Sequence, residues 1–238
     1  KKVAKGQMEE DAANNHVDQV FSRISGGQLD HVADSADIII EAIIEDLKIK
    51  LPFFENLGAT AKPDAILATN TSSYSVMEMA EASNIADRVC GLHYFNPVQV
   101  MKLVEIIKTD KTHPGVITTV QEFVEKTGKV AVNCGDTPGF IVNRLLVPYL
   151  AQGVALLARG DATAADIDTA MKLGAGHPMG PIMLADYVGL DVNLAILDGW
   201  LEKYPDDPAY QVPEAYALFK QMVSEGRLGK KHHLKLNS

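Results

Sequence analysis

Several features are scarce in this sequence of 238 residues, and each scarcity excludes a class of protein. Two cysteines, Cys90 and Cys134, are too few for the disulfide framework of a small secreted protein and favour a reducing compartment. No apolar run approaches the roughly 20 residues that span a bilayer, so we expect no membrane-spanning helix. Positive charge is also scarce, and the net charge of −9 argues against nucleic acid as a partner.

The remaining composition is that of a folded globular protein. Hydrophobic residues make up 47% of the chain and charged residues 22%, which is far from the composition of a disordered segment. A chain of this length can form one large domain or two modest domains, each with its own core.

Short apolar runs alternate with helical stretches between residues 33 and 133. Unbroken apolar strands that alternate with helices predict a parallel sheet with helices on both faces. Residues 1–24 are polar and favour helix or loop. The predicted strands lie near residues 36–44, 65–69, 88–95, 102–107 and 129–133, and the predicted helices near 47–60, 76–82 and 115–127.

The pattern changes after residue 135, where we find no convincing strand. Thr137 and Pro138 are typical of a helix N-cap and first helical position, and predict a helix that extends to about residue 158. We therefore predict an α/β domain over residues 1–135 and an all-α domain over residues 136–238. Further helices are predicted near residues 163–174, 181–203 and 214–225.

Gly174-Ala-Gly176-His-Pro-Met-Gly180 looks like a nucleotide-binding loop but has the wrong context. Such a loop follows a strand and begins a helix, so that phosphates meet the helix N-terminus. This segment follows a predicted helix, so we interpret it as a helix end and interhelical turn. No Gly-x-Gly-x-x-Gly motif occurs elsewhere in the sequence.

Polar residues directly after apolar strands are the informative ones in a doubly wound sheet, because ligands bind beyond the carboxyl ends of the strands. Three predicted strands end in this way, the first at Glu45, the second at residues 70–73 and the third at residues 93–97. We expect these strand ends to lie side by side along one crevice.

His93 and Glu105 are candidates for an acid–base pair. Imidazole titrates near neutrality, and a carboxylate that alternates with apolar neighbours in a strand needs a partner. A carboxylate beside a histidine fixes its tautomer and strengthens it as a base. The alternatives are a histidine satisfied inside the core and a strand glutamate that faces solvent.

Ser72 and Asn143 have both functional and structural interpretations. Ser72 either binds ligand at a strand end or caps the helix that begins at Val76, and its spacing favours the cap. Asn143 is mildly unfavourable within a helix, which suggests a hydrogen bond across the domain boundary, although an exposed helix position is the alternative. We expect no metal site.

Several segments together resemble L-3-hydroxyacyl-CoA dehydrogenases, most closely the short-chain mitochondrial type. The similarity covers nearly everything from residue 33 to 231, in order. Its segments are Asn70-Thr-Ser-Ser73, Gly91-Leu-His-Tyr-Phe-Asn-Pro97, Met101-Lys-Leu-Val-Glu105, Asp136-Thr-Pro-Gly-Phe-Ile-Val-Asn-Arg144, Arg159-Gly-Asp161, Ile167-Asp-Thr-Ala-Met-Lys-Leu-Gly-Ala-Gly176, Pro178-Met-Gly-Pro181 and Asp186-Tyr-Val-Gly-Leu190.

The resemblance implies a partial Rossmann-like, doubly wound sheet followed by a helical domain, and NAD-dependent oxidation of L-3-hydroxyacyl-CoA in fatty-acid β-oxidation. It implies that His93 is the general base, paired with Glu105, and that Ser72 and Asn143 hold the substrate oxygens. Glu45, Lys50, Ser72, Asn96 and Lys231 would contact NAD, and Lys2 or Lys5 the phosphates of coenzyme A.

The resemblance also implies a homodimer formed through the helical domain, so part of the apolar surface of helices 139–158 and 181–203 would be interface. It implies the mitochondrial matrix, although no transit peptide is recognisable, and otherwise the cytoplasm.

The sequence departs from the family at its start. The family begins with a strand, a Gly-x-Gly-x-x-Gly loop and a helix, and this sequence contains no such unit. We therefore interpret the chain as N-terminally truncated and expect it to bind NAD poorly and to have little activity.

Two other functions share this scaffold. One is a non-catalytic, crystallin-like or interaction protein of the same fold. The other is a dehydrogenase for a different substrate, such as a 2-hydroxyacid. The presence of His93, Glu105, Ser72 and Asn143 favours an enzyme over the first alternative, and the paired His93 and Glu105 argue against the second.

Overall fold

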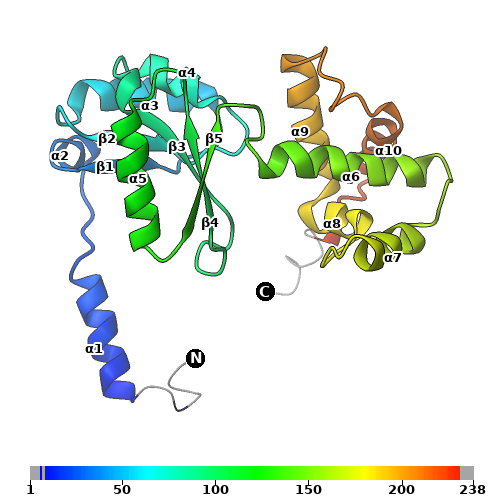
Figure 1. The fold of residues 1–238 in the computed structure, drawn as a ribbon, viewed down its shortest axis with the longest axis horizontal. Coiled ribbons are helices and arrows are strands. Elements are labelled where there is room, and N and C mark those ends of the chain that lie inside the picture. The colour runs from blue at the N-terminus through cyan, green and yellow to red at the C-terminus, as the bar shows by residue number, and fades with distance from the viewer. Residues whose placement is uncertain (1–5, 7–8, 231–238) are drawn as a thin grey trace.

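The computed structural model describes residue 6 and residues 9–230, which form an α/β domain followed by a helical domain (Figure 1). Five strands make one sheet in the order β1-β2-β3-β4-β5, and all five lie within or beside their predicted ranges. Their bounds are β1 Ile38–Glu41, β2 Ile66–Thr69, β3 Val89–Tyr94, β4 Leu103–Lys108 and β5 Val130–Gly135.

The sheet is mostly parallel, as expected, but β4 departs from the pattern. β1, β2 and β3 run parallel to one another, and β5 runs parallel to β4, whereas β4 runs antiparallel to β3. A parallel return needs a crossover of about a dozen residues or more. The connection over residues 95–102 is shorter and contains no helix, so the chain returns antiparallel.

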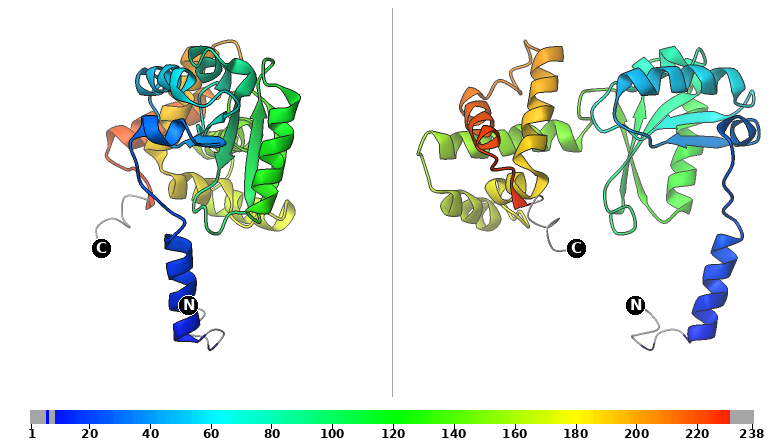
Figure 2. Two further views of the ribbon diagram at one scale, coloured as in Figure 1. Left: turned by 90° about the vertical axis from the view of Figure 1, so that its left-hand side faces the viewer. Right: turned by 180° about the vertical axis from the view of Figure 1, so that it is seen from behind.

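Helices cover both faces of the sheet (Figures 1 and 2). On one face, Phe54 of α3 and Met79 of α4 belong to one hydrophobic core. On the other face, Val120 of α5 and Leu92 of β3 belong to a second core. Both faces of β2 and β3 are therefore buried, which explains their unbroken apolar sequences. The helices of this domain are α2 Leu29–Ala33, α3 Leu47–Thr60, α4 Val76–Ala82 and α5 Pro114–Lys126, with a 3₁₀ turn at Ala86–Arg88.

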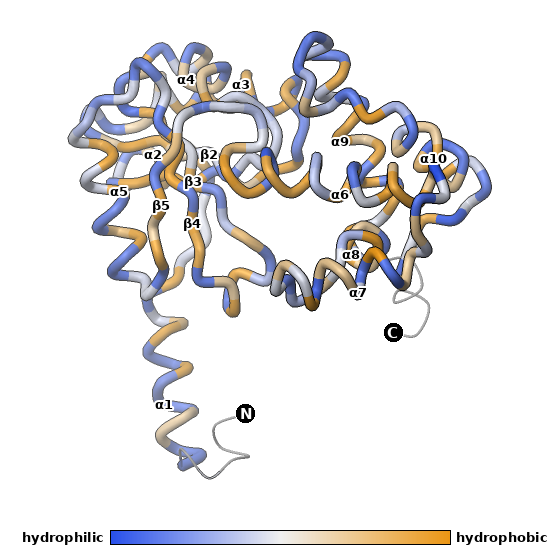
Figure 3. The backbone as a smooth tube through the Cα atoms, turned by 45° about the vertical axis from the view of Figure 1, so that its right-hand side comes forward, coloured by the Kyte–Doolittle hydropathy of each residue, from blue (hydrophilic) through white to orange (hydrophobic). Residues whose placement is uncertain are grey.

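Helix α1, Glu10–Phe21, stands away from both domains (Figures 1 and 2). None of its residues is buried, and Phe21 is 68% exposed. Figure 3 shows hydrophobic and hydrophilic residues interspersed along it. The helix is therefore formed by local propensity and carries apolar side chains that this fold does not cover.

The helices after β5 pack around a core of their own. Leu150, Leu197 and Phe219 are each about 1% exposed within it. No strand occurs after Gly135 in the part of the chain that the structure describes. The helices are α6 Val142–Ala158, α7 Ala164–Gly174, α8 Pro181–Val188, α9 Leu190–Lys203 and α10 Pro213–Ser224.

Two helix predictions in this domain need correction, and one turn prediction is confirmed. The helix predicted over residues 181–203 is two helices, because Gly189 has a φ of 108° that no helix accommodates. The helix predicted from Thr137 begins only at Val142. The glycine segment at 174–180 does end α7 and precede α8, as its context predicted.

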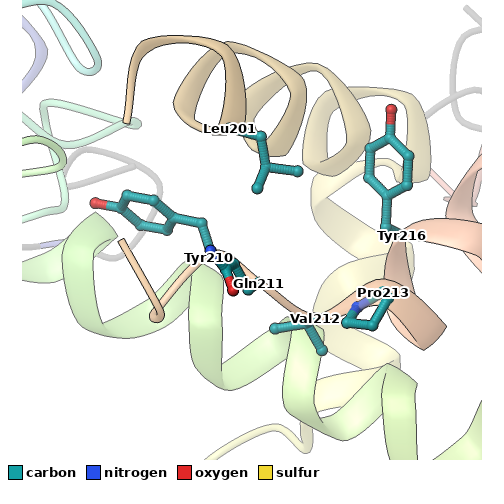
Figure 4. A pocket seen from close by; sticks show the side chains of 6 residues that line it. All are labelled: Leu201, Tyr210, Gln211, Val212, Pro213 and Tyr216. Atoms are coloured by element: carbon teal, nitrogen blue, oxygen red, sulfur yellow. The ribbon is translucent and has the colours of Figure 1, made fainter. Parts of the chain in front are cut away.

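A pocket of about 410 Å³ lies in the helical domain alone (Figure 4). None of the strand-end residues contributes to it, and its wall contains no charged side chain. It is lined by Leu201, Tyr210, Gln211, Val212, Pro213 and Tyr216. Among the described residues, no helix combines the length and hydrophobicity needed to cross a membrane.

Candidate active site

His93 lies near the end of β3 and is almost completely buried, with 4% of its surface exposed. Its Nδ1 lies 2.7 Å from Oε2 of Glu105 on the neighbouring strand β4. The two residues are direct cross-strand partners in the antiparallel register, so their side chains leave the sheet on the same face. The contact predicted from the alternation around Glu105 is therefore present, and the solvent-facing alternative for Glu105 is wrong.

The other nitrogen of the imidazole faces a hydroxyl. Ser72 lies in the loop that follows β2, and its Oγ is 3.1 Å from Nε2 of His93. Because the Glu105 carboxylate acts as an acceptor, the proton between the pair belongs on Nδ1 of His93, which leaves Nε2 free to accept a proton. Ser72 does not cap α4, so the cap that its spacing favoured is wrong.

The second oxygen of Glu105 binds the start of the helical domain. Its Oε1 accepts hydrogen bonds from the backbone N–H groups of Ile141 and Val142, at 3.1 and 2.9 Å. These are among the N–H groups that have no partner within a helix. A carboxylate at this position is also favoured by the helix dipole. Gly139 and Phe140 have positive φ values of 78° and 55°, so α6 begins only at Val142, where this remote cap lies, and not near Thr137.

Asn143 is the second residue of α6 and reaches back to the α/β domain. Its Nδ2 donates a hydrogen bond to the backbone carbonyl of Ser72 at 3.3 Å. The predicted hydrogen bond across the domain boundary is therefore present. Side chains from β3, β4, the loop after β2 and α6 meet at one place.

Lys50 of α3 is fully buried between two carboxylates. Its Nζ lies 3.0 Å from Oε1 of Glu41 and 2.8 Å from Oε2 of Glu45. Glu41 is itself buried and also accepts a hydrogen bond from Oγ1 of Thr69 at 2.7 Å. Lys50 has no exposed surface in this structure. Its contact with the loop that carries Ser72 is indirect, because Lys50 pairs with Glu45 and Glu45 in turn binds that loop. The sequence had singled out Lys50 and Glu45 but not Glu41.

Glu45 connects this buried pair to the loop that carries Ser72. Its Oε1 accepts hydrogen bonds from the backbone N–H of Ser72 at 3.1 Å and from Oγ of Ser73 at 3.2 Å. Burial disfavours the charged form of Glu45, but hydrogen bonds from Lys50 and Thr71 outweigh it and lower the pKa of this carboxyl below its ordinary value. The ionised carboxylate therefore fixes the backbone of the loop near neutral pH.

Asp136 is a second residue whose structural role the sequence analysis did not predict. Its carboxylate accepts hydrogen bonds from the backbone N–H groups of Val76 and Met77, each at 2.9 Å, and from the hydroxyl of Ser75. It therefore supplies the cap of α4 that was expected from Ser72. No local signal indicated it, because Asp136 lies about sixty positions further along the chain.

Comparison with known proteins identifies the family to which this chain belongs. Residues 1–137 match the family model for the NAD binding domain of 3-hydroxyacyl-CoA dehydrogenase, and residues 139–236 match the model for its C-terminal domain. The chain belongs to the 3-hydroxyacyl-CoA dehydrogenase family. It is therefore an enzyme of this kind, with NAD as its cofactor.

Individual relatives agree with this assignment. The chain is 47% identical over 234 residues to the mitochondrial hydroxyacyl-coenzyme A dehydrogenase of Rattus norvegicus, covering 97% of this chain and 74% of that protein. It is 50% identical over 200 residues to a probable 3-hydroxyacyl-CoA dehydrogenase of Caenorhabditis elegans, covering 84% and 66%. Among solved structures, (S)-3-hydroxybutyryl-CoA dehydrogenase PaaH1 from Ralstonia eutropha superposes with a TM-score of 0.87 at 34% identity, covering 97% and 79%.

The strand ends of this dehydrogenase suit one end of NAD. Glu45, Ser72 and Asn96 follow the adjacent parallel strands β1, β2 and β3, at the edge where doubly wound sheets bind their ligands. Carboxylate, hydroxyl and amide groups are suitable partners for ribose hydroxyls and a carboxamide. Lys231, and Lys2 or Lys5, lie outside the described residues.

Proposed function

We propose that this enzyme oxidises L-3-hydroxyacyl-CoA to 3-ketoacyl-CoA with NAD in fatty-acid β-oxidation. The family membership supports the reaction type. The observation that carries the residue-level proposal is the imidazole of His93, held at one nitrogen by Glu105 and facing Ser72 with the other. A base that is oriented by a carboxylate and opens toward a hydroxyl-lined site suits the removal of a proton from an alcohol.

In this proposal His93 accepts the proton of the substrate 3-hydroxyl at Nε2. NAD, when bound, would supply the acceptor for the hydride that leaves the carbon carrying that hydroxyl. Glu105 then stabilises the imidazolium through the hydrogen bond at Nδ1, which keeps the ring in one orientation throughout. A positioned base of this kind contributes about 10²–10⁴-fold to the rate.

Ser72 and Asn143 hold the substrate oxygens in the proposed complex. Ser72 belongs to the α/β domain and Asn143 to the helical domain, and they already touch through the backbone carbonyl of Ser72. A substrate oxygen bound by both would complete the site only when the two domains are together, which also excludes water from the reacting carbon.

Glu45, Ser72 and Asn96 contact the cofactor in this proposal, and Lys50 fixes Glu45 in its ionised form. The buried ion pair between Lys50 and Glu41 supports this role of Lys50. It holds the lysine in the interior of the α/β domain, where its amino group also contacts the carboxylate of Glu45. Lys231 is proposed to close over the cofactor from the end of the chain. We place the boundary between the two domains at residues 135 and 136.

The proposal includes a homodimer formed through the helical domain. Large apolar side chains are exposed on the helices of this domain. They support the expectation that part of the apolar surface of these helices is dimer interface. Leu145 of α6 is 68% exposed and Tyr187 of α8 is 54% exposed. We also propose the mitochondrial matrix as its location, supported by the mitochondrial name of the rat relative.

The test is the oxidation of NADH in the presence of acetoacetyl-CoA. We would assay the 238-residue chain and the product of the complete open reading frame that contains it. Acetoacetyl-CoA-dependent oxidation of NADH by the longer product supports the proposed reaction, and the ratio of the two rates measures the activity of this chain. No turnover by either protein contradicts the proposal and favours a crystallin-like, non-catalytic role.

A further inference from the structure

Two phenylalanine rings contact the imidazole of His93. The ring centroid of Phe95 lies 4.5 Å from that of His93 at an interplanar angle of 50°, and the ring centroid of Phe140 lies 5.5 Å away at 60°. Both separations lie in the range of favourable contacts between aromatic rings. Phe95 lies just beyond the end of β3, whereas Phe140 belongs to the connection between β5 and α6 that links the two domains (Figure 1).

Hydrogen bonds leave the imidazole some freedom to turn. Its Nδ1 is held by Glu105 and its Nε2 faces Ser72. The torsion that turns a histidine ring about its Cβ–Cγ bond has broad minima, so a ring held at its nitrogens still tilts. Phe140 is only 5% exposed, and a bulky side chain held in this way restricts the tilt.

The backbone of Phe140 adopts an unfavourable conformation. Its φ is 55°, which is a genuine outlier for a bulky residue. Such a conformation costs free energy, persists only where the surrounding structure imposes it, and is concentrated at functional sites. Among the described residues other than glycine, only Asn84 also has a positive φ, and asparagine tolerates that conformation better.

Contacts on both sides of Phe140 impose this conformation. Its backbone N–H donates a hydrogen bond to the carbonyl of Thr137 at 2.8 Å. The next two backbone N–H groups, of Ile141 and Val142, donate to Oε1 of Glu105. Glu105 therefore holds the segment that carries Phe140 with one oxygen and holds His93 with the other.

We propose that Phe140 is a positioning residue whose ring keeps the imidazole of His93 in its reactive orientation. The proposal rests on the proposed function, since it assigns a role toward the proposed base. Phe140 acts through His93, so the loss of its ring lowers the rate of proton transfer. The binding of NAD and of the acyl-CoA substrate stays unchanged.

A purely structural role for Phe140 is the alternative, because Phe140 also belongs to the hydrophobic core on one face of the sheet. Phe54 belongs to the same core and has no exposed surface. Its ring pairs with Phe53, at a centroid distance of 6.3 Å, instead of with His93. Replacement of Phe54 therefore disturbs the same core without changing a contact of the imidazole, which makes it the matched control.

The turnover test uses the product of the complete open reading frame with Phe140→Leu and Phe54→Leu. Phe140→Leu should lower kcat by about ten- to a hundredfold, because a misplacement of about 1 Å can cost 10²-fold. The KM for acetoacetyl-CoA, the affinity for NADH and the kcat of Phe54→Leu should each stay within about twofold of the parent. Phe140→Met, which also removes the ring, is the second variant should Phe140→Leu not fold.

A double-mutant cycle tests whether Phe140 acts through His93. Residues that act through one another are not additive in their effects, so Phe140→Leu should lower the kcat of His93→Gln by less than about twofold. An undiminished effect of Phe140→Leu in the His93→Gln protein overturns the proposal. An equal fall of kcat in Phe140→Leu and Phe54→Leu also overturns it.

The orientation of His93 can also be observed without turnover. In protein with ¹³C-labelled histidine rings, the NMR signal that is lost in His93→Gln identifies this imidazole. That signal should shift and broaden in Phe140→Leu and keep its position in Phe54→Leu, and an unmoved signal in Phe140→Leu overturns the proposal. Failure of the proposed function is distinguishable, because His93→Gln would then turn over acetoacetyl-CoA as fast as the parent while the signal still reports on Phe140.

Discussion

Glu105 connects His93 to the helical domain through its two oxygens. One oxygen lies 2.7 Å from Nδ1 of His93. The other accepts hydrogen bonds from the backbone N–H groups of Ile141 and Val142, at the start of α6. The orientation of the imidazole is therefore tied both to the register of β3 and β4 and to the position of α6. A shift of the helical domain acts on the same carboxylate that orients the proposed base.

Replacement of His93 by glutamine tests the proposed base. Glutamine retains a polar side chain but accepts no proton near neutral pH, so kcat should fall by about 10²–10⁴-fold while NAD affinity stays nearly unchanged. The measurements are steady-state turnover of acetoacetyl-CoA and titration with NADH, with His16→Gln in exposed α1 as the control. An equal loss of NADH affinity in His93→Gln would mean that His93 is structural.

Replacement of Lys50 by methionine tests the buried ion pairs. Methionine preserves helix propensity and volume but leaves Glu41 without its cationic partner, which should lower the free energy of unfolding by about 3–5 kcal/mol. The measurement is the urea midpoint of the α/β domain. Lys62→Met is the control, since Lys62 pairs with the exposed Asp37 and should change the midpoint little. Equal shifts in the two variants would refute a special role for burial.

Gly139→Ala tests the turn that precedes α6. Gly139 has a φ of 78°, and a Cβ there would lie 2.7 Å from the backbone nitrogen of Arg144 and 2.8 Å from the ring of Trp200. Gly160→Ala is the matched control, because Gly160 has a φ of 75° with open space around it. The control should lose about 1–2 kcal/mol from the left-handed backbone alone. Gly139→Ala should lose clearly more in thermal unfolding, and similar losses would show that the turn yields easily.

Alkylation of the cysteines gives a prediction for pH. Burial raises the pKa of the Cys90 thiol to about 12, and burial together with the Glu105 and Asp136 carboxylates raises that of Cys134 to about 11. The thiolate is the reactive form, and at pH 7 only about one Cys134 in ten thousand is in that form. Iodoacetamide labelling of the folded protein, followed by mass spectrometry, should be slow at pH 7 and rise about tenfold per pH unit toward 11. A rate that levels off near pH 9, the ordinary thiol value, would contradict the raised pKa.

Much of the fold follows from local sequence patterns. The strands from Ile38 to Gly135 and the helix Leu47–Thr60 were predicted because apolar runs and helix ends are encoded within a few residues. The direction of β4 was missed, although the short, helix-free connection at residues 95–102 carried the necessary information. The broken helix at Gly189 was missed because glycine alone does not reveal the sign of φ.

The sequence predicted the contacts of the site where a residue stands out from the local pattern of its own strand. It did not predict contacts that depend on how separate segments pack together. Glu105 stood out as a charge within an apolar strand, and His93 was the evident partner. The capping of α6 by Glu105 depends on a contact between residues 36 positions apart, and the pairing of Lys50 with Glu41 depends on how α3 packs against the end of β1. Periodicity and propensity do not encode such contacts.

The Asp136 cap of α4 has a consequence for the order in which the chain folds. Helix α4 has only 7 residues, too few to persist alone in water. Its terminal N–H groups gain their carboxylate acceptor only after three further strands and α5 have brought residue 136 into place. In pulse-labelling hydrogen exchange during refolding, the amides of Val76 and Met77 should therefore gain protection with β5 and not before it. A short helix near the middle of the chain is in this sense completed by the last strand of the sheet.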